Sequence, residues 1–493
     1  MKAIQIHPSD NVVVALEDIV KGETIKLGAG QTVTAAEAVT RGHKIALQAI
    51  PSDGAVIKYG CVIGLATRGI APGEWVHTHN VKTGLSEGGT YSFRHRAFAM
   101  PHVESRSFLG FWREDGRAAT RNELWIIPTV GCVNSVAQRL AQENQHLVVG
   151  SVEGLYAFPH PFGCSQMGED HAKTKKLLAA LARHPNAGGV LVLGLGCENL
   201  TMDQFKSELG EWDERRVRFM VCQSETNEFA AGAAVLKELA AYASQFRRET
   251  IPASELVVGM KCGGSDGLSG ITANPTVGRF SDRLIAMGGT TILTEVPEMF
   301  GAESILFNRC ADERVFERAV RMVENFKRYF TTHGQVVYEN PSPGNKAGGI
   351  TTLEDKSCGC VQKGGCAEIT DILDYGESVT KKGLNLLSGP GNDLVSTTAL
   401  TAAGTHVILF TTGRGTPFGA PSPTVKISTS TALYEKKENW IDFNAGTVAQ
   451  GESLDDAATR LLEFVLQVAG GKRTKAELRG AREIAIFKDG VVL

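Results

Sequence analysis

The chain has few of the features that mark secreted, membrane or nucleic-acid-binding proteins. Its 493 residues carry 51 lysines and arginines against 54 aspartates and glutamates, a net charge of −3, which leaves no basic excess for nucleic acid or a membrane surface. The longest apolar run, Gly188 to Cys197, is far too short to span a bilayer. Residues Met1 to His7 lack the apolar core of a signal peptide. Ten cysteines in so long a chain do not indicate a disulfide framework, so we expect a reducing, cytoplasmic location.

Two common nucleotide-binding motifs are also missing. The sequence has no GxGxxG followed by a downstream acid and no GxxxxGK[ST], which argues against a dinucleotide cofactor and against ATP. A hydrophobic fraction of 42% and a charged fraction of 21% are ordinary for folded domains, and the length predicts two to four of them.

The pattern along the chain predicts three units: a small β-rich unit over residues 1–95, an α/β unit over 109–248 and a second α/β unit over 252–493, with a polar linker around 94–106. In the first unit, short alternating stretches are interrupted by turn residues every 8 to 12 positions, as in a compact barrel-like module. In the other two, β-branched runs alternate with helical stretches, which predicts mainly parallel sheets.

Specific elements follow from these patterns. We expect the second unit to contain strands at 124–128, 147–152, 189–195 and 218–222 and helices at 136–145, 170–183, 202–209 and 227–246. We expect the third to contain strands at 256–262, 290–295, 384–387 and 406–411 and helices at 276–287, 313–329 and 454–468. Between them, residues 340–365 read as a long loop-rich insert, a feature that is usually functional or mobile.

Three cysteines occur in short motifs of one design: Gly131-Cys132-Val133-Asn134, Gly163-Cys164-Ser165-Gln166 and Gly196-Cys197-Glu198-Asn199. Each motif places a thiol after a glycine, which allows close approach of a ligand, and an amide side chain two residues further on. The motifs follow predicted strands, and α/β sheets bind ligands at the carboxyl ends of their strands. The three thiols are therefore candidates for a shared metal or redox-sensitive site, although Cys164 could also be a packing thiol.

Two histidines, His77 and His79, are predicted to share one face of an extended segment, because side chains alternate along a strand. Together with His43 in the same unit, they are candidates for metal or acid–base chemistry. The alternative is a polar strand end.

Two cations are candidates for holding a carboxylate. Arg414 lies between glycines after the strand expected at 406–411, a position suited to bidentate carboxylate binding or, alternatively, to a phosphate loop. Lys346 lies among glycines and prolines and could bind a carboxylate or act as a base if its pKa is lowered; a solvated loop lysine is the alternative. We interpret the neighbouring Glu354-Asp355-Lys356 as a solvated charge cluster.

The chain resembles the altronate/galactarate dehydratase family of hydro-lyases over nearly its whole length. The resemblance is carried by the three cysteine motifs and by four further strings, 184–188, 262–270, 296–303 and 339–356. It implies an N-terminal SAF domain of the β-clip type and a larger catalytic region. It also implies loss of water from D-altronate to give 2-dehydro-3-deoxy-D-gluconate in hexuronate (galacturonate) catabolism, with Fe²⁺ as the usual metal. Mn²⁺ and an iron–sulfur cluster are the alternative cofactors. Family members also act on galactarate or sulfolactate.

Within this resemblance we assign roles to named residues. The metal neighbourhood is assigned to Cys132, Cys164 and Cys197. Substrate binding is assigned to Asn134, Gln166, Asn199 and Arg414. Catalysis is assigned to His43, His77, His79 and Lys346. Removal of a proton α to a carboxylate needs a base, and a cation that stabilises the resulting enediolate assists it.

Two versions of the metal site remain open: a single Fe²⁺ with mixed ligands, or an iron–sulfur cluster held by three thiolates with one iron open to substrate. Two other functional classes also remain, a nicotinamide oxidoreductase and a non-catalytic sugar-acid binding protein. The expected partner is a small sugar acid, without nucleic acid or membrane, and a homo-oligomer is left open.

Overall fold

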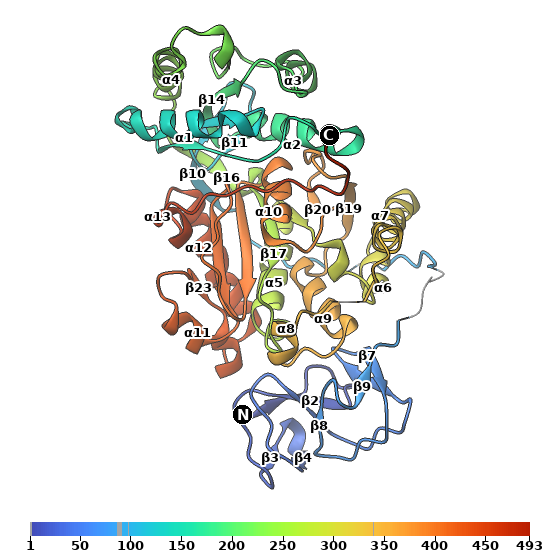
Figure 1. Ribbon diagram of the computed structural model, residues 1–493. Coiled ribbons are helices and arrows are strands. Elements are labelled where there is room, and N and C mark those ends of the chain that lie inside the picture. The colour runs from blue at the N-terminus through green and yellow to red at the C-terminus, as the bar shows by residue number, and fades with distance from the viewer. Residues whose placement is uncertain (1, 86–90, 97, 339) are drawn as a thin grey trace.

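The structure, a computed structural model, describes residues 2–85, 91–96, 98–338 and 340–493. Three units lie in a row, with the N-terminal unit at one end, the second unit at the other and the C-terminal unit between them (Figure 1). The expectation of a small β-rich unit followed by two α/β units with mainly parallel sheets is confirmed. Residues 86–90 of the predicted first unit and residue 97 of the predicted linker lie outside the described residues. No helix within the described ranges is long and apolar enough to cross a membrane.

The N-terminal unit is built from short antiparallel strands. One sheet has the order β1-β2-β5-β8, a second the order β6-β7-β9, and β3 and β4 form a hairpin. The bounds are β1 (Ala3–Ile4), β2 (Val12–Ala15), β3 (Thr24–Lys26), β4 (Thr32–Thr34), β5 (Lys44–Ala46), β6 (Ala55–Lys58), β7 (Cys61–Ala66), β8 (Trp75–Val76) and β9 (Val81–Lys82). Apolar residues from both sheets fill two small cores.

The second unit contains a four-stranded parallel sheet of order β13-β12-β14-β15. Its strands are β12 (Glu123–Pro128), β13 (Gly154–Ala157), β14 (Ala187–Gly194) and β15 (Val217–Val221), and its helices are α1 (Asn134–Glu143), α2 (Gly168–Arg183), α3 (Met202–Leu209) and α4 (Glu228–Ala243). The strand predicted at 147–152 is wrong. Leu147 and Val148 instead pack against the apolar core of the α1 and α4 face, and the strand follows at 154–157.

A small three-stranded sheet joins the second unit to the C-terminal unit. Strand β10 (Ser107–Trp112), which precedes the second unit, pairs antiparallel with β11 (Ala118–Ala119) and with β16 (Glu249–Pro252), which follows that unit. The chain therefore enters and leaves the second unit at one place, next to the C-terminal unit.

The C-terminal unit is organised around a seven-stranded parallel sheet of order β19-β20-β18-β17-β21-β22-β23. The strands are β17 (Val257–Cys262), β18 (Thr290–Leu293), β19 (Ile369–Leu373), β20 (Gly383–Leu387), β21 (Val407–Thr412), β22 (Thr424–Ser428) and β23 (Phe443–Asn444). The helices are α5 (Ala273–Ala286), α6 (Glu303–Phe307), α7 (Glu313–Thr332), α8 (Pro343–Ala347), α9 (Leu353–Cys360), α10 (Asp393–Ala402), α11 (Thr431–Lys436), α12 (Leu454–Ala469) and α13 (Lys475–Leu478). Helices α5 and α12 share one core with the sheet and α10 covers its other face, so the strands are apolar on both sides.

The predicted loop-rich insert at 340–365 is wrong, because it folds into α8, α9 and a 3-10 turn, Val361–Gly364. Every residue of α9 is buried, including three charged ones. A helix buried on all sides lacks the one-sided apolar periodicity from which helices are read in a sequence. Its start is nevertheless encoded locally, since the side chain of Thr352 accepts a hydrogen bond from the Asp355 amide.

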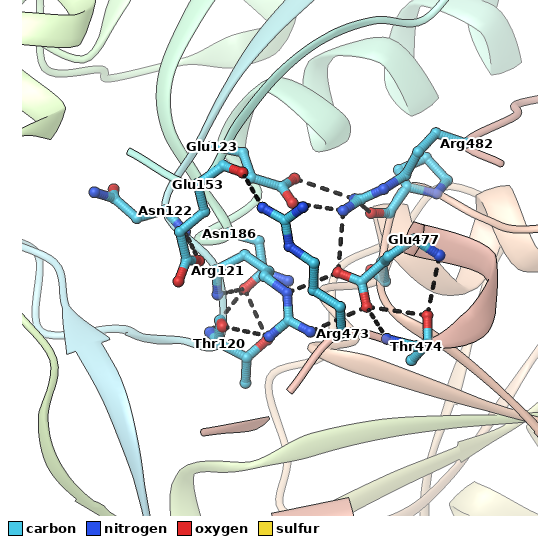
Figure 2. Close-up of polar contacts among 12 residues, drawn as sticks. Thr120, Arg121, Asn122, Glu123, Glu153, Asn186, Arg473, Thr474, Glu477 and Arg482 are labelled. Atoms are coloured by element: carbon cyan, nitrogen blue, oxygen red, sulfur yellow. Dashed lines mark hydrogen bonds and ion pairs between the residues drawn. The ribbon is translucent and has the colours of Figure 1, made fainter. Parts of the chain in front are cut away.

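Buried ion pairs connect the second unit to the C-terminal segment (Figure 2). Arg121 pairs with Glu477 at 2.8 Å, and Arg482 pairs with Glu123 at 2.6 Å and with Glu477 at 3.2 Å. Each side chain is at most 4% exposed. Because these charges are buried, each needs its partner, and the pairs join the second unit to the C-terminal segment.

A second buried ion cluster joins the N-terminal unit to α9. Lys44 Nζ lies 2.8 Å and Lys58 Nζ 3.1 Å from the carboxylate of Asp355, and none of the three side chains is more than 1% exposed. Burial alone would raise the pKa of Asp355, but the two ammonium groups hold it well below its ordinary value. Lys44 also donates to the Gly349 carbonyl at 2.8 Å. The N-terminal unit is therefore anchored directly to the chain segment that leads into α9.

We expect Asp355→Asn to lower the free energy of unfolding by about 3–5 kcal/mol, because two buried ammonium groups lose their counter-charge. Asp53→Asn is the matched control: Asp53 pairs with Lys82 at 2.9 Å, but both side chains are more than half exposed. Its expected cost is below about 1 kcal/mol. Denaturant unfolding of the two variants measures the difference, and equal costs would contradict the anchoring role.

Candidate active site

A cavity of about 500 Å³ opens at the carboxyl edge of the seven-stranded sheet. Its walls come from the end of β17 and the following glycines, the turn after β18, helices α7, α8 and α9, and the start of α10. The polar residues that line it are Cys262, Ser265, Glu298, Asn340, Ser342, Asn345, Lys356 and Asp393. Aromatic side chains from α7 and Phe487 of the C-terminal segment form the apolar wall. This is the edge at which parallel α/β sheets bind ligands.

Charged side chains of both signs lie buried beneath the cavity. Lys261 Nζ is 2.5 Å from Glu295 and 2.7 Å from Asp393, and Lys363 is 3.3 Å from the other oxygen of Glu295. Lys356 is 2.9 Å from Glu298. Three lysines thus balance three carboxylates. Asp393 is the most accessible of them, with a side chain 34% exposed, while Lys261 and Glu295 are completely buried.

The floor of the cavity brings together two thiols and a carboxylate. Cys262 Sγ donates to Glu298 Oε2 at 2.9 Å and lies 3.4 Å from Cys360 Sγ. One ligand atom from each of the three lies within 4.8 Å of the other two, and among the described residues this is the one His/Cys/Asp/Glu group of three or more that meets the limit. Two ligands held by one ion at about 2.3 Å each lie at most about 4.6 Å apart, and the separations of 2.9 and 3.4 Å from Cys262 Sγ to Glu298 and Cys360 fall within that limit.

The charge states of the cavity follow from these contacts. Burial alone would lower the pKa of Lys356, but Glu298 and the two nearby thiols raise it above the ordinary value. Burial alone would raise the pKa of Glu298, but the surrounding lysines hold it well below. The hydrogen bond with Cys262, then burial, raises the pKa of Cys360 well above its ordinary value. Near neutral pH the cavity therefore presents an ammonium group, a carboxylate and a protonated thiol.

Backbone strain marks the same place. Glu295, directly after β18, adopts a left-handed conformation with φ = 72°, which non-glycine residues rarely adopt. Its carboxylate accepts from the amide of Cys262 at 2.9 Å and so ties the turn to the end of β17. Strain of this kind persists where surrounding contacts over-determine it, typically at functional sites.

The predicted histidine group lies in the N-terminal unit, at its contact with the C-terminal unit and outside the lining of the cavity. His43 accepts a hydrogen bond from Trp75 Nε1 at 3.1 Å, its ring lies 5.0 Å from that of His77, and His77 contacts Thr351 at 3.3 Å. The prediction that His77 and His79 share a face of an extended segment is wrong. Strand β8 ends at Val76, and a turn buries His77 and exposes His79.

Burial, together with Lys44 and His43, lowers the pKa of His77 to about 4. In the unfolded chain a histidine has a pKa of about 6.5. As the pH falls, the unfolded state therefore binds this proton before the folded state does. The free energy of unfolding contributed by His77 is fully present above about pH 6.5 and is lost as the pH falls towards 4. We expect His77→Gln to reduce the fall in Tm between pH 7.5 and 5. His79→Gln, at an exposed neighbour, should keep the wild-type slope; an unchanged slope in both variants would contradict a neutral, buried His77.

The two predicted carboxylate-binding cations lie around α8. Arg414 is exposed and donates to the Gly344 carbonyl at 2.8 Å. Lys346 is half-buried, one residue after Asn345, which lines the cavity. Neither residue lines the cavity itself, so their predicted roles in substrate binding and catalysis stay predictions.

The three predicted thiols lie at the carboxyl edge of the other parallel sheet, in the second unit. Cys132, Cys164 and Cys197 are all exposed. Their sulfur atoms do not form a group within 4.8 Å, so the three do not make a preformed site for one shared ion. Each of the three lies on its own exposed turn, whereas Cys262 of β17 and Cys360 of α9 are buried with their sulfur atoms 3.4 Å apart.

The amides predicted to bind substrate hold these turns instead. Asn134 donates to the His160 carbonyl at 2.8 Å, and Asn199 accepts from the Ser165 amide at 2.7 Å. Gln166 is buried and accepts from the Gly163 amide at 3.2 Å, while its amide nitrogen has no partner among the described residues. Their first role is therefore to shape the cysteine turns.

Sequence reasoning missed most of the cavity. Lys356 was interpreted as part of a solvated cluster, but Glu354, Asp355 and Lys356 are at most 8% exposed. A usable signal existed at the end of β17, where Lys261 and Cys262 finish an apolar strand at the edge that binds ligands. Two of their partners, Cys360 of α9 and Asp393 of α10, lie more than 90 positions away in the sequence, which spacing alone does not reveal.

Comparison with known proteins agrees with this architecture. Residues 1–84 match the model of the altronate/galactarate dehydratase SAF domain, residues 110–244 that of the D-galactarate dehydratase/altronate hydrolase second domain, and residues 253–492 that of the D-galactarate/altronate dehydratase C-terminal domain. An altronate dehydratase of Bacillus subtilis (strain 168) is 52% identical, with 99% of both chains covered. An altronate dehydratase of Escherichia coli (strain K12) is 50% identical, with both chains covered completely, and the galactarate dehydratase (L-threo-forming) of the same organism is 34% identical over 95% of this chain and 93% of its own. The chain belongs to the altronate/galactarate dehydratase family.

Proposed function

We propose that this protein is an altronate dehydratase, a hydro-lyase that removes water from D-altronate to give 2-dehydro-3-deoxy-D-gluconate in galacturonate catabolism. The full-length identity of about 50% to two altronate dehydratases supports this substrate over galactarate, for which the relative is only 34% identical. A cytoplasmic location is part of the proposal and is supported by ten free cysteines. The homo-oligomer stays a prediction.

The observation that carries the proposal is the cavity at the carboxyl edge of the seven-stranded sheet. Its volume of about 500 Å³ suits a six-carbon sugar acid. Lys356 supplies a positive charge for the substrate carboxylate, and Asn340 and Asn345, whose side-chain oxygens lie 3.0 and 3.3 Å from its Nζ, hold that ammonium group in position. A buried lysine fixed in this way binds an anion without further reorganisation.

Asp393 is the proposed base. It lines the cavity, its side chain is one-third exposed, and Lys261 orients it from 2.7 Å. In the reaction, the proton on C2 passes to the Asp393 carboxylate, the C3 hydroxyl departs and takes up that proton to leave as water, and the resulting enol becomes the 2-keto acid. The histidines of the N-terminal unit lie outside the cavity, so Asp393 is the better placed proton acceptor.

Iron, the metal implied by the family resemblance, fits Cys262, Glu298 and Cys360. The set offers two sulfurs and one oxygen, a combination that suits iron better than magnesium. Metal binding requires deprotonated thiols, and Lys356 and Lys363 lie close enough to compensate their charge. When bound, the metal would act as a Lewis acid on the carboxylate and 2-hydroxyl of the substrate.

The direct experiment is an assay of 2-keto acid formation from D-altronate under reducing conditions with added Fe²⁺, with galactarate and a panel of other aldonates as comparators. We expect altronate to give the highest kcat/KM. Binding of altronate without formation of a keto acid would favour the non-catalytic alternative. A higher kcat/KM for galactarate would indicate a galactarate dehydratase instead.

A further inference from the structure

We propose that Cys132, Cys164 and Cys197 form a second cofactor site, which holds an iron–sulfur cluster through three thiolates. The site lies at the carboxyl edge of the four-stranded sheet in the second unit, on different elements from the cavity of the C-terminal unit. It does not depend on the proposed altronate dehydratase activity, because it rests on the three turns alone.

The three cysteine turns are tied to one another. The Gly131 amide donates to the Phe162 carbonyl at 2.9 Å, and the Leu200 amide donates to the Gly163 carbonyl at 3.0 Å. The Ser165 amide donates to Asn199 at 2.7 Å. The turn that carries Cys164 therefore bridges the other two, and all three thiols emerge from one hydrogen-bonded assembly.

The turn of Cys164 has no room for a side chain at Gly163. Gly163 has φ = 98°, and a Cβ atom there would lie 1.8 Å from the Thr129 carbonyl oxygen. Two residues on, Ser165 is left-handed with φ = 59° although it is not glycine. The buried amide nitrogen of Gln166 has no partner among the described residues. A strained turn with an unpaired buried donor indicates a group that the turn is shaped to hold.

The turn of Cys197 is also held by hydrogen bonds. The carboxylate of Glu198 accepts hydrogen bonds from the amides of Leu195 and Gly196 at 3.0 and 2.6 Å and from the Thr129 hydroxyl at 2.7 Å. It therefore holds the turn in place. Gln223 Nε2 lies 3.5 Å from Cys197 Sγ, at the distance of a hydrogen bond to sulfur. Donors to ligand sulfurs of this kind tune clusters.

The arrangement of the thiols bears on the kind of cofactor. Thiolates on one ion at about 2.3 Å cannot lie more than about 4.6 Å apart, and the three sulfurs do not meet a 4.8 Å limit. A cluster spreads its ligands more widely, because each thiolate binds a different iron. Three thiolates on a four-iron cluster leave one iron open to a small oxygen ligand. Three exposed thiols on turns that are hydrogen-bonded to one another, and that do not meet the single-ion limit, are the ligand set that we assign to a cluster.

The test is anaerobic reconstitution of the full chain with iron, sulfide and a thiol reductant, followed by absorption and Mössbauer spectroscopy and by iron and acid-labile sulfide analysis. We expect broad visible charge-transfer absorption with about four sulfides per chain. Cys164→Ser should abolish the absorption and the labile sulfide. Cys366→Ser, at a half-buried cysteine outside both sites, should retain them.

A second pair of variants separates this site from the cavity. Cys360→Ser should keep the cluster spectrum and the labile sulfide but lose one iron per chain, whereas Cys164→Ser should keep that iron. Wild-type protein without labile sulfide, or with sulfide that survives in a Cys132→Ser/Cys164→Ser double variant, would overturn the proposal. Either result would leave the assay for altronate unaffected, so the two proposals fail independently.

Discussion

Lys356→Met is expected to lower kcat/KM for altronate by about 10²–10³-fold, because removing one partner of a buried hydrogen-bonded charge pair costs about 2–5 kcal/mol. Lys356 lies 2.9 Å from Glu298 and is the ammonium group that lines the cavity. Without it the substrate carboxylate faces the Glu298 carboxylate with no compensating charge. Steady-state kinetics in the presence of iron measures the effect.

Two further variants interpret this result. Lys356→Arg keeps the positive charge, so it should recover part of the activity if the cation acts on the carboxylate. Lys382→Met makes the same change at a lysine that is more than half exposed and pairs with Glu255, and should leave kcat/KM unchanged. A folded Lys356→Met protein with wild-type kcat/KM would rule out the cavity as the site where the carboxylate binds.

Asp393→Asn is expected to lower kcat by about 10²–10⁴-fold, the usual contribution of a general base. The substitution preserves the size of the side chain and leaves the substrate cation and the thiols in place, so KM and iron content should change little. The residual reaction should show a larger primary isotope effect with C2-deuterated altronate, because proton removal becomes slower than the other steps.

The control for this variant is Asp374→Asn, at an exposed aspartate of the same unit. It should retain wild-type kcat. Exchange of the C2 proton with deuterated solvent gives an independent reading: wild-type protein should catalyse it and Asp393→Asn should not. Normal exchange in the variant would show that another group removes the proton.

Sequence patterns predict two kinds of element well: helices that bury one face, and strands that are buried along their whole length. Helix α3 begins and ends where expected, and β17, β20 and β21 are displaced by at most one residue. Along the chain, apolar strands alternate with amphipathic helices, and the prediction rests on this pattern.

The elements that were missed owe their structure to distant partners. In α9, Asp355 is neutralised by lysines from the N-terminal unit and Lys356 by Glu298. From local sequence alone, charged residues such as these are predicted to be exposed. Only the folded chain brings the opposite charge that allows them to be buried.

The same distinction applies to the candidate site. The cysteine motifs of the second unit were visible because glycine, thiol and amide lie within four residues. Cys262 and Cys360 are 98 positions apart and meet at 3.4 Å only because β17 and α9 converge. The family resemblance implied the chemistry, whereas the location of the cavity required the three-dimensional arrangement.

The central claim is that the sugar acid binds in the cavity of the C-terminal unit beside Cys262, Glu298 and Cys360. The most direct measurement is an anaerobic crystal structure of the iron-loaded Asp393→Asn protein soaked with altronate, with anomalous data collected at the iron edge. We predict an iron peak between these three residues and an altronate carboxylate at Lys356. Altronate bound at the cysteine turns of the second unit, with no metal in the cavity, would contradict the claim.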